Sequence, residues 1–329
     1  MALRTRLNEM LDVEHPIISA PMAFAAGGYL AATITAAGGL GLIGGGYGDA
    51  DWLEREFAEA RSTRVGCGFI TWSLAKRPEL LDLVLAHAPV AAMLSFGSPI
   101  PFARPIKDAG AKLICQIQCI DHAREAVGAG ADIIVAQGAE AGGHGLTRAT
   151  LTLVPEVADY LAKAAPATVL VAAGGIADGR GLAAALMLGA DGVLIGSRFW
   201  ASFEALVNPA FQRRATSADG DSTIRTTAVD VARKIAWPSS FTARVMKTRF
   251  VEDWHGRETE LAKPEVVDRE MQRYVSAMRT GDPDNTGVWV GEATGLIKDV
   301  RPAGDLLQEI VRDAVHLLRD KAPTIIQIA

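Results

Sequence analysis

One histidine follows a run of glycines, and it is the residue of this chain best suited to acid–base chemistry. The apolar segment 133–137 resembles a buried strand, and Gly-Ala-Glu-Ala-Gly-Gly-His-Gly follows it as residues 138–145. Glycines let a loop approach a ligand closely, and imidazole titrates near neutral pH. We therefore predict His144 as a catalytic residue that removes a proton or binds an anion. The competing interpretation is an ordinary surface-loop histidine, and we expect Glu140 to anchor the loop rather than to bind a metal.

Two glycine-containing turns later in the chain are suited to binding a phosphate. The apolar segments 169–173 and 192–196 lead into Gly174-Gly175 and into Gly196-Ser197. Backbone N–H groups at such turns, together with the Ser197 hydroxyl, can donate hydrogen bonds to phosphate oxygens. A phosphate site of this kind typically forms after strands 7 and 8 of a (β/α)8 barrel. The alternative is that these glycines only allow close packing of helices on a sheet.

The elements that must position these residues alternate in type from residue 16 to residue 200. Short apolar segments, bounded by Gly, Pro or polar residues, are typical of buried parallel strands, and helical patterns lie between most of them. Eight such strands predict an α/β fold, a (β/α)8 TIM barrel. The predicted strands are Ile17–Ala20, Gly41–Gly44, Val65–Thr71, Val90–Ser95, Lys112–Gln118, Ile133–Gln137, Val169–Ala173 and Gly192–Gly196.

The pattern changes after Trp200. Residues 208–290 carry many charges, three of the six tryptophans, and helical rather than strand-like runs. We predict that they form a helical insertion after strand 8 that covers the active-site mouth, while residues 1–207 and 291–329 form the barrel. A group of aromatic residues either lines the roof of a cavity or packs the insertion on the barrel: Trp237, Trp254, Trp289 and Phe241.

Two further places lie at the predicted mouth of the barrel. Small residues and a proline end the first strand at 19–23. They either let a planar ring lie against the backbone or form an ordinary turn at the end of the strand. Gln116 and Gln118 are two apart on the fifth strand, so their side chains face the same way. Their amides either reach a ring at the mouth or form a buried polar layer inside the barrel.

Several classes of function are disfavoured by composition and context. The net charge of −5 gives no basic field for nucleic acid, and the three cysteines show no metal-binding spacing. The G-x-G-x-x-G match at 39–44 follows a helical pattern and leads into a strand, which is the wrong context for a dinucleotide site. The start of the chain has no signal-peptide pattern, and no apolar run reaches membrane-spanning length, so we expect a cytoplasmic protein without a membrane or metal partner.

Several motifs together resemble one family. They are APMA at 20–23, GFITW at 68–72, MLSFG at 93–97, AQGAEAGGHG at 136–145, AAGGIADG at 172–179 and IGSRF at 195–199. The set resembles the nitronate monooxygenase family, formerly called 2-nitropropane dioxygenase, whose barrels bind FMN. The resemblance continues into the late segments 254–258 and 291–293.

The resemblance implies roles for particular residues. It implies that Gly174, Gly175, Gly196 and Ser197 hold the FMN phosphate, and that His144 faces the substrate over the flavin. The residues that it places along the flavin ring, the ribityl chain or the loop beside them are Ala20, Met22, Gln116, Gln137, Gly142 and Gly143.

The implied activity is FMN-dependent oxidation of alkyl nitronates by O2 to a carbonyl compound and nitrite. Flavin-dependent reductases of quinones or enoyl-thioesters that use NAD(P)H share the EAGGH and AAGGIADG stretches, so they stay as an alternative. A flavin-binding barrel without catalysis and a flavin-free barrel that binds a sugar phosphate also stay open. A homo-oligomer is left open, and His144 acts either as a base or as a group that binds the nitro oxygens.

Overall fold

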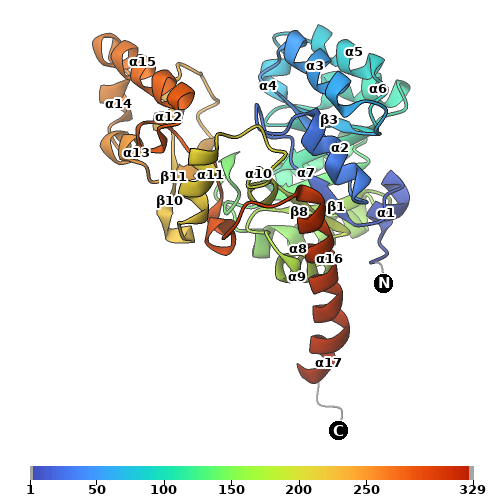
Figure 1. Cartoon of the computed structure of the whole chain (residues 1–329). Helices are drawn as coiled ribbons and strands as arrows, with labels where there is room; N and C mark the ends of the chain where they lie inside the picture. The colour runs from blue at the N-terminus through green and yellow to red at the C-terminus, as the bar shows by residue number, and fades with distance from the viewer. Residues whose placement is uncertain (1–2, 326–329) are drawn as a thin grey trace.

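In a computed structural model, which describes residues 3–325, eight parallel strands form a barrel ringed by helices (Figure 1). The strand order is β1-β9-β8-β6-β5-β4-β3-β2, and a parallel bridge between Ile18 of β1 and Leu40 closes the ring. The predicted (β/α)8 barrel is therefore confirmed. Its strands are β1 (Ile17–Ser19), β2 (Leu42–Gly46), β3 (Gly66–Ile70), β4 (Ala91–Ser95), β5 (Lys112–Ile117), β6 (Ile133–Gln137), β8 (Val169–Ala173) and β9 (Gly192–Ile195).

Side chains of the barrel strands alternate between two hydrophobic clusters. On β6, Ile133 and Val135 pack inside the barrel, whereas Ile134 and Ala136 pack outward against the helices. Both faces of each strand are therefore buried, which explains why the strands are continuous apolar runs in the sequence.

Helices cover the outside of the barrel, and α16 fills the gap in the ring by packing against both α9 and α2. The outer helices are α2 (Gly28–Ala36), α3 (Ala50–Ala60), α4 (Thr71–Leu74), α5 (Glu79–Ala86), α6 (Ile100–Asp108), α7 (Ile120–Gly128), α8 (Thr150–Ala164), α9 (Gly179–Met187) and α16 (Ala303–His316). α1 (Arg6–Leu11) precedes the barrel, and the π-helical turn Leu317–Lys321 leads from α16 into α17 (Ala322–Ile325), which projects away from the body (Figure 1).

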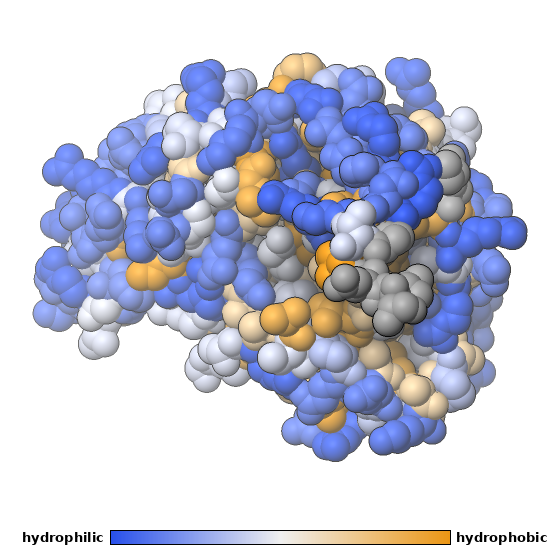
Figure 2. Space-filling model, turned by 90° about the horizontal axis from the view of Figure 1, so that it is seen from below, coloured by the Kyte–Doolittle hydropathy of each residue, from blue (hydrophilic) through white to orange (hydrophobic). Residues whose placement is uncertain are grey.

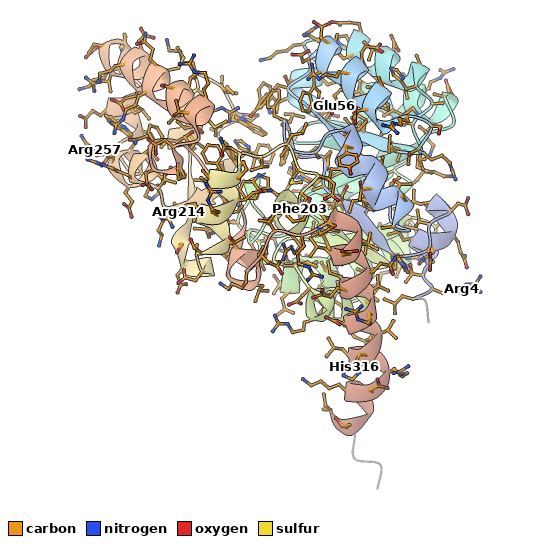
Figure 3. All side chains as sticks on the ribbon, in the orientation of Figure 1. Arg4, Glu56, Phe203, Arg214, Arg257 and His316 are labelled. Atoms are coloured by element: carbon orange, nitrogen blue, oxygen red, sulfur yellow. The ribbon has the colours of Figure 1, made fainter. Side chains whose placement is uncertain are left out.

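The segment that follows β9 forms an arm beside the barrel, and Arg214 and Arg257 lie on it (Figures 1 and 3). The sequence predicted a helical insertion here, but the segment also contains two antiparallel strands, β10 (Thr223–Thr226) and β11 (Thr242–Met246). α10 (Ser197–Trp200) stays at the barrel, where Phe199 packs among the barrel strands and helices. The later helices of the segment are α11 (Pro209–Thr216), α12 (Ala228–Ala232), α13 (Arg249–Trp254), α14 (Glu258–Leu261) and α15 (Pro264–Thr280), and its 3-10 turns are Gly220–Ser222, Pro283–Asn285 and Glu292–Leu296.

The arm is tied to the barrel through a three-stranded antiparallel sheet. Its third strand, β7 (Gly143–Gly145), comes from the segment after β6, and Ala243 of β11 pairs with His144. The glycine-rich run that we expected as a loop therefore ends in a strand. The correction has a simple reason: β7 is ordered by a partner strand about a hundred residues later in the chain.

The surface seen from below is mainly hydrophilic, with apolar residues gathered near the centre of that face (Figure 2). Among residues 3–325, no helix combines the length and the apolar character needed to cross a membrane.

We expect the buried thiols to be inert at neutral pH. Burial raises the pKa of Cys67 and of Cys115 to about 12, so almost none of either thiol is a thiolate at pH 8. Cys119 is only partly buried. Alkylation of the native protein with iodoacetamide at pH 8, followed by mass analysis, should modify Cys119 first. Equal early modification of Cys67 would contradict this prediction.

Candidate active site

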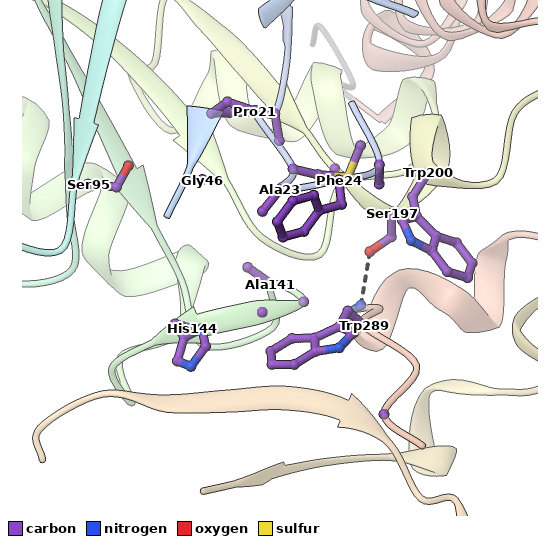
Figure 4. A pocket seen from close by; sticks show the side chains of 18 of the residues that line it. Pro21, Ala23, Phe24, Gly46, Ser95, Ala141, His144, Ser197, Trp200 and Trp289 are labelled. Atoms are coloured by element: carbon purple, nitrogen blue, oxygen red, sulfur yellow. Dashed lines mark hydrogen bonds between the residues drawn. The ribbon is translucent and has the colours of Figure 1, made fainter. Parts of the chain in front are cut away.

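A cavity of about 650 Å³ opens between the carboxyl ends of the barrel strands and the arm (Figure 4). In (β/α)8 barrels, this end of the strands is where ligands bind. The structure brings all the site residues predicted from the sequence to the wall of this one cavity. They are Ala20, Met22, Gln116, Gln137, Gly142, Gly143, His144, Gly174, Gly175, Gly196 and Ser197.

The two glycine turns present unpaired donors to the cavity. Among the described residues, the backbone N–H groups of Gly175, Gly196 and Ser197 donate to no acceptor. Gly175 has φ +73°, which glycine adopts without strain, and an added Cβ at Gly196 would contact only Ala20 and Met22, both of which line the cavity. Free N–H groups converging on open space are suited to an anion such as a phosphate.

Gly291 is a further part of this anion site that sequence reasoning did not single out as a ligand group. Its backbone N–H donates to the Ser197 hydroxyl at 2.9 Å (Figure 4), and the next N–H, of Glu292, donates to the Glu140 carbonyl at 2.9 Å. An added Cβ at Gly291 would lie 2.5 Å from that carbonyl oxygen. The chain returning from the arm therefore closes on the two glycine turns, and it needs glycine to approach this closely.

The segment after β1 forms the opposite wall of the cavity. Figure 4 shows Pro21, Ala23 and Phe24 across the cavity from His144 and Trp289. Phe24 has φ +59° and a half-exposed side chain, and Phe96, after β4, has φ +65°. Left-handed backbone at bulky residues is strained and is common at functional sites. The strained backbone of these two phenylalanines thus supports the interpretation of the cavity as a functional site.

Glutamine side chains form the floor near β5 and β6. The Gln137 Oε1 accepts two hydrogen bonds, from Gln116 Nε2 at 3.1 Å and from Gln118 Nε2 at 2.9 Å. Only Gln116 and Gln137 of these three line the cavity. These two hydrogen bonds assign the orientation of the Gln137 amide, with its oxygen toward Gln116 and Gln118. The N–H groups of the same amide are therefore left for a ligand.

His144 is buried and paired with a carboxylate from the arm. Its Nε2 lies 2.8 Å from Oδ2 of Asp230, which belongs to α12, and the two residues are 7% and 3% exposed. The other ring nitrogen, Nδ1, makes no hydrogen bond within the described chain and is not sealed from the cavity. The interpretation of His144 as a surface-loop residue is therefore wrong.

Aromatic rings fix the plane of the His144 imidazole. Trp237 stacks on it with ring centroids 3.4 Å apart and an angle of 10°, and Trp289 lies 5.5 Å away at 36°. Phe96 approaches edge-on at 6.3 Å. Trp237 in turn donates its indole N–H to the Tyr47 hydroxyl at 3.0 Å, which ties the arm to the segment after β2.

The electrostatics around His144 favour its neutral form. Burial lowers the pKa of His144 below its usual value of 6.5, and the nearby cations Arg233 and Arg225 act in the same direction. The hydrogen bond and the charge of Asp230 oppose this shift without reversing it. A neutral imidazole at pH 7 can serve as a base.

Two partly buried side chains hold the segment 139–145 in place. Arg225 of β10 donates to the Ala139 carbonyl at 3.2 Å and to the Gly145 carbonyl at 2.6 Å. Glu140 accepts hydrogen bonds from the Thr150 N–H and hydroxyl at 2.9 Å. Glu140 thus has the contacts expected of a loop anchor.

The aromatic residues of the insertion, for which both a cavity roof and packing were open, do not all have the same place. Trp237 and Trp289 line the cavity, and Phe241 packs against Trp237 and Phe96. Trp254 is instead buried in the arm's own hydrophobic core. Asp230, Arg233 and Tyr47 were missed, because no motif marks them in the sequence.

The fold and the cavity define the class of protein: a (β/α)8 barrel with an anion site and a buried histidine at the carboxyl ends of its strands. The family model described as nitronate monooxygenase matches residues 4–68 and 70–313. A nitronate monooxygenase of Neurospora crassa is 33% identical, with 97% of this chain and 94% of that protein covered. A (3aS,4S,5R,7aS)-5-hydroxy-7a-methyl-1-oxo-octahydro-1H-indene-4-carboxyl-CoA dehydrogenase of Mycobacterium tuberculosis is 30% identical over 96% of this chain and 98% of its own.

Among solved structures, FabK from Thermotoga maritima is similar to the whole molecule. The TM-score is 0.85 at 31% identity, with 98% of this chain and 100% of that chain covered. The chain belongs to the nitronate monooxygenase family. Members of this family are oxidoreductases, so this chain is an oxidoreductase rather than a barrel without catalysis. The family and its structural neighbours are flavoproteins in general.

Proposed function

We propose that this enzyme binds FMN and oxidises alkyl nitronates, and nitroalkanes after their ionisation, with O2 to a carbonyl compound and nitrite. The observation that carries the proposal is that one cavity joins unpaired donors for a phosphate to a buried, neutral histidine. The family of the chain supports both the flavin and the class of substrate.

The residues of the cavity fit FMN. Gly174, Gly175, Gly196 and Ser197 would hold its phosphate, and the Ser197 hydroxyl, which accepts from the Gly291 N–H, keeps its own hydrogen to donate. Gln116 and Gln137 would meet the flavin ring with amide groups, and Ala20 and Met22 would lie along the ring and ribityl chain. The redox chemistry, in which electrons pass from the nitronate to O2, belongs to FMN when it is bound.

The residues around His144 orient the substrate and handle its proton. The Trp237 stack and the Asp230 hydrogen bond fix the ring of this cavity-lining residue and leave Nδ1 without a hydrogen-bond partner among the described residues. A neutral nitroalkane would lose its α-proton to Nδ1, and the electron pair of the C–H bond would move onto the nitro group to give the nitronate. The rings of Trp289 and Phe96, 5.5 Å and 6.3 Å from the imidazole centroid, would help to exclude water from the site.

Anaerobic reduction of the purified flavoprotein tests the proposal. Bleaching of the flavin absorbance by an alkyl nitronate, followed by nitrite release when O2 is admitted, is the expected result. Rapid bleaching by NADH or NADPH, with no response to nitronate, would favour a reductase instead.

That second function has its own support. The FabK structure and the Mycobacterium tuberculosis CoA-ester dehydrogenase are as similar to this chain as the nitronate monooxygenases are. A reductase of enoyl-thioesters or quinones is therefore the second candidate function. The same anaerobic reduction with NADH and with NADPH distinguishes it from nitronate oxidation.

A further inference from the structure

We infer that Asp230 is the positioning residue of the active site: from the arm, it holds His144 with its hydrogen on Nε2 and so leaves Nδ1 as the base. This inference rests on the proposed function. It assigns a role to a residue that no sequence motif marks and that lies 86 positions from its partner.

The first step of the argument is the hydrogen bond itself. An ionised carboxylate can only accept, so the 2.8 Å contact between His144 Nε2 and Asp230 Oδ2 requires the hydrogen on Nε2. A neutral imidazole then has its lone pair on Nδ1, the nitrogen that is not sealed off and has no hydrogen-bond partner among the described residues, on a side chain that lines the cavity. In this tautomer, Nδ1 accepts a proton and donates nothing to a nitro oxygen.

The second step is that Asp230 itself is held by its surroundings. Asp230 sits in α12, whose residues pack into the arm's hydrophobic core, and its carboxylate is nearly fully buried. Its other oxygen, Oδ1, has no hydrogen-bond donor, and the Arg233 guanidinium lies 3.9 Å from it. Arg233 is in turn placed over the rings of Tyr47 and Trp289. The Arg233 guanidinium therefore offsets part of the negative charge of Asp230 from the Oδ1 side, and it does not compete with His144 for Oδ2.

The third step is the consequence for proton transfer. When Nδ1 takes the α-proton of a nitroalkane, the C–H bond breaks, its electron pair forms the nitronate, and His144 becomes an imidazolium. The adjacent carboxylate stabilises that cation, while Arg233 and Arg225 oppose it. A preformed nitronate needs no such transfer, so its oxidation does not depend on the tautomer.

The test begins with the wild-type holoenzyme, so that it does not depend on any variant folding. Nitrogen-15 NMR of the histidine side chains, with His144 identified by the signal lost in His144→Ala, should show a neutral ring with hydrogen on Nε2. A hydrogen on Nδ1 would overturn the inference. Because this readout needs no turnover, it stands apart from the proposed function, which fails if the wild-type enzyme oxidises neither nitronate nor nitroalkane.

The Asp230→Asn variant then tests the consequence. An amide can donate to Nε2 as well as accept from it, so the tautomer is no longer fixed. We expect kcat/KM for neutral nitroalkane to fall about 10- to 100-fold, the loss common when carboxylate partners of metal-binding histidines are removed. The rate with preformed nitronate should change far less. Asp268→Asn, the same change at an exposed position of α15, is the matched control and should alter neither rate.

Two further readouts separate positioning from a merely structural role. In Asp230→Asn, the acid limb of the nitroalkane pH profile should move to lower pH, because the variant loses the favourable carboxylate and keeps Arg233 and Arg225 near His144. In a His144→Ala background, Asp230→Asn should cause little additional loss. Equal losses with nitroalkane and nitronate, with the pH profile unmoved, would overturn the inference.

Discussion

Replacing His144 with alanine is expected to lower kcat/KM for a neutral nitroalkane by about 10²–10⁴-fold, the usual contribution of a positioned base. The rate with the preformed nitronate should fall far less, because that substrate has already lost its proton. Both rates are measured as nitrite release, with nitroalkane diluted freshly before it ionises in the buffer.

The role of His144 as a base also predicts how the activity of the wild-type enzyme depends on pH. Burial holds the pKa of His144 below 6.5, so the ring is unprotonated from neutral pH down to that lowered pKa. Nitroalkane activity should stay level as the pH falls toward 6.5 and should drop only below it. His144→Ala should lack this acid limb.

His255→Ala is the matched control for the histidine substitution. His255 ends α13 on the arm, is exposed, and lies outside the wall of the cavity. It should keep wild-type rates with both substrates. Full activity of His144→Ala with nitroalkane and nitronate alike would remove His144 from the mechanism.

The barrel could be predicted from the sequence because each strand is buried on both faces. Segments such as 133–137 and 169–173 are short apolar runs with sharp ends, and counting them set the order of the strands. That order placed Gly174, Gly196 and His144 at the same end of the barrel. The barrel side of the cavity wall could therefore be predicted from the ends of the strands.

The elements that the sequence did not reveal depend on distant partners or on unusual residues. β7 exists because β11 pairs with it, and Asp230 reaches His144 only through the folding of the arm. The helix α6 contains Pro101 and Pro105, which remove backbone N–H groups and hide its helical pattern. Trp254 shows the same limit, since composition alone does not say which tryptophan faces the cavity.

Replacing Gly196 with valine is expected to abolish FMN retention while leaving the fold intact. Gly196 has φ −102°, which other residues adopt, and an added Cβ would lie 3.6 Å from Ala20 and 3.8 Å from the Met22 sulfur, in ordinary contact. The new Cβ therefore has room among the protein atoms, and we expect the two methyl groups of valine to fill the space in front of the free N–H groups. We expect the FMN affinity to fall at least about 100-fold, or about 2.7 kcal/mol.

Thermal unfolding separates binding from stability in this experiment. FMN at about 100 times its Kd should stabilise the wild-type protein by about 2.7 kcal/mol, and it should have almost no effect on Gly196→Val. Without FMN, the free energy of unfolding of the variant should lie within about 1 kcal/mol of the wild type.

Gly128→Val is the matched control, because Gly128 ends α7 on the exposed surface and an added Cβ there would meet nothing within 4 Å. It should bind FMN normally. Ser197→Ala should show a smaller loss than Gly196→Val, about 1.5 kcal/mol, because it removes one hydroxyl donor and leaves the N–H groups in place. If Gly196→Val instead binds FMN as tightly as Gly128→Val does, the phosphate does not lie between the two glycine turns, and the orientation of the flavin toward His144 would have to be reversed.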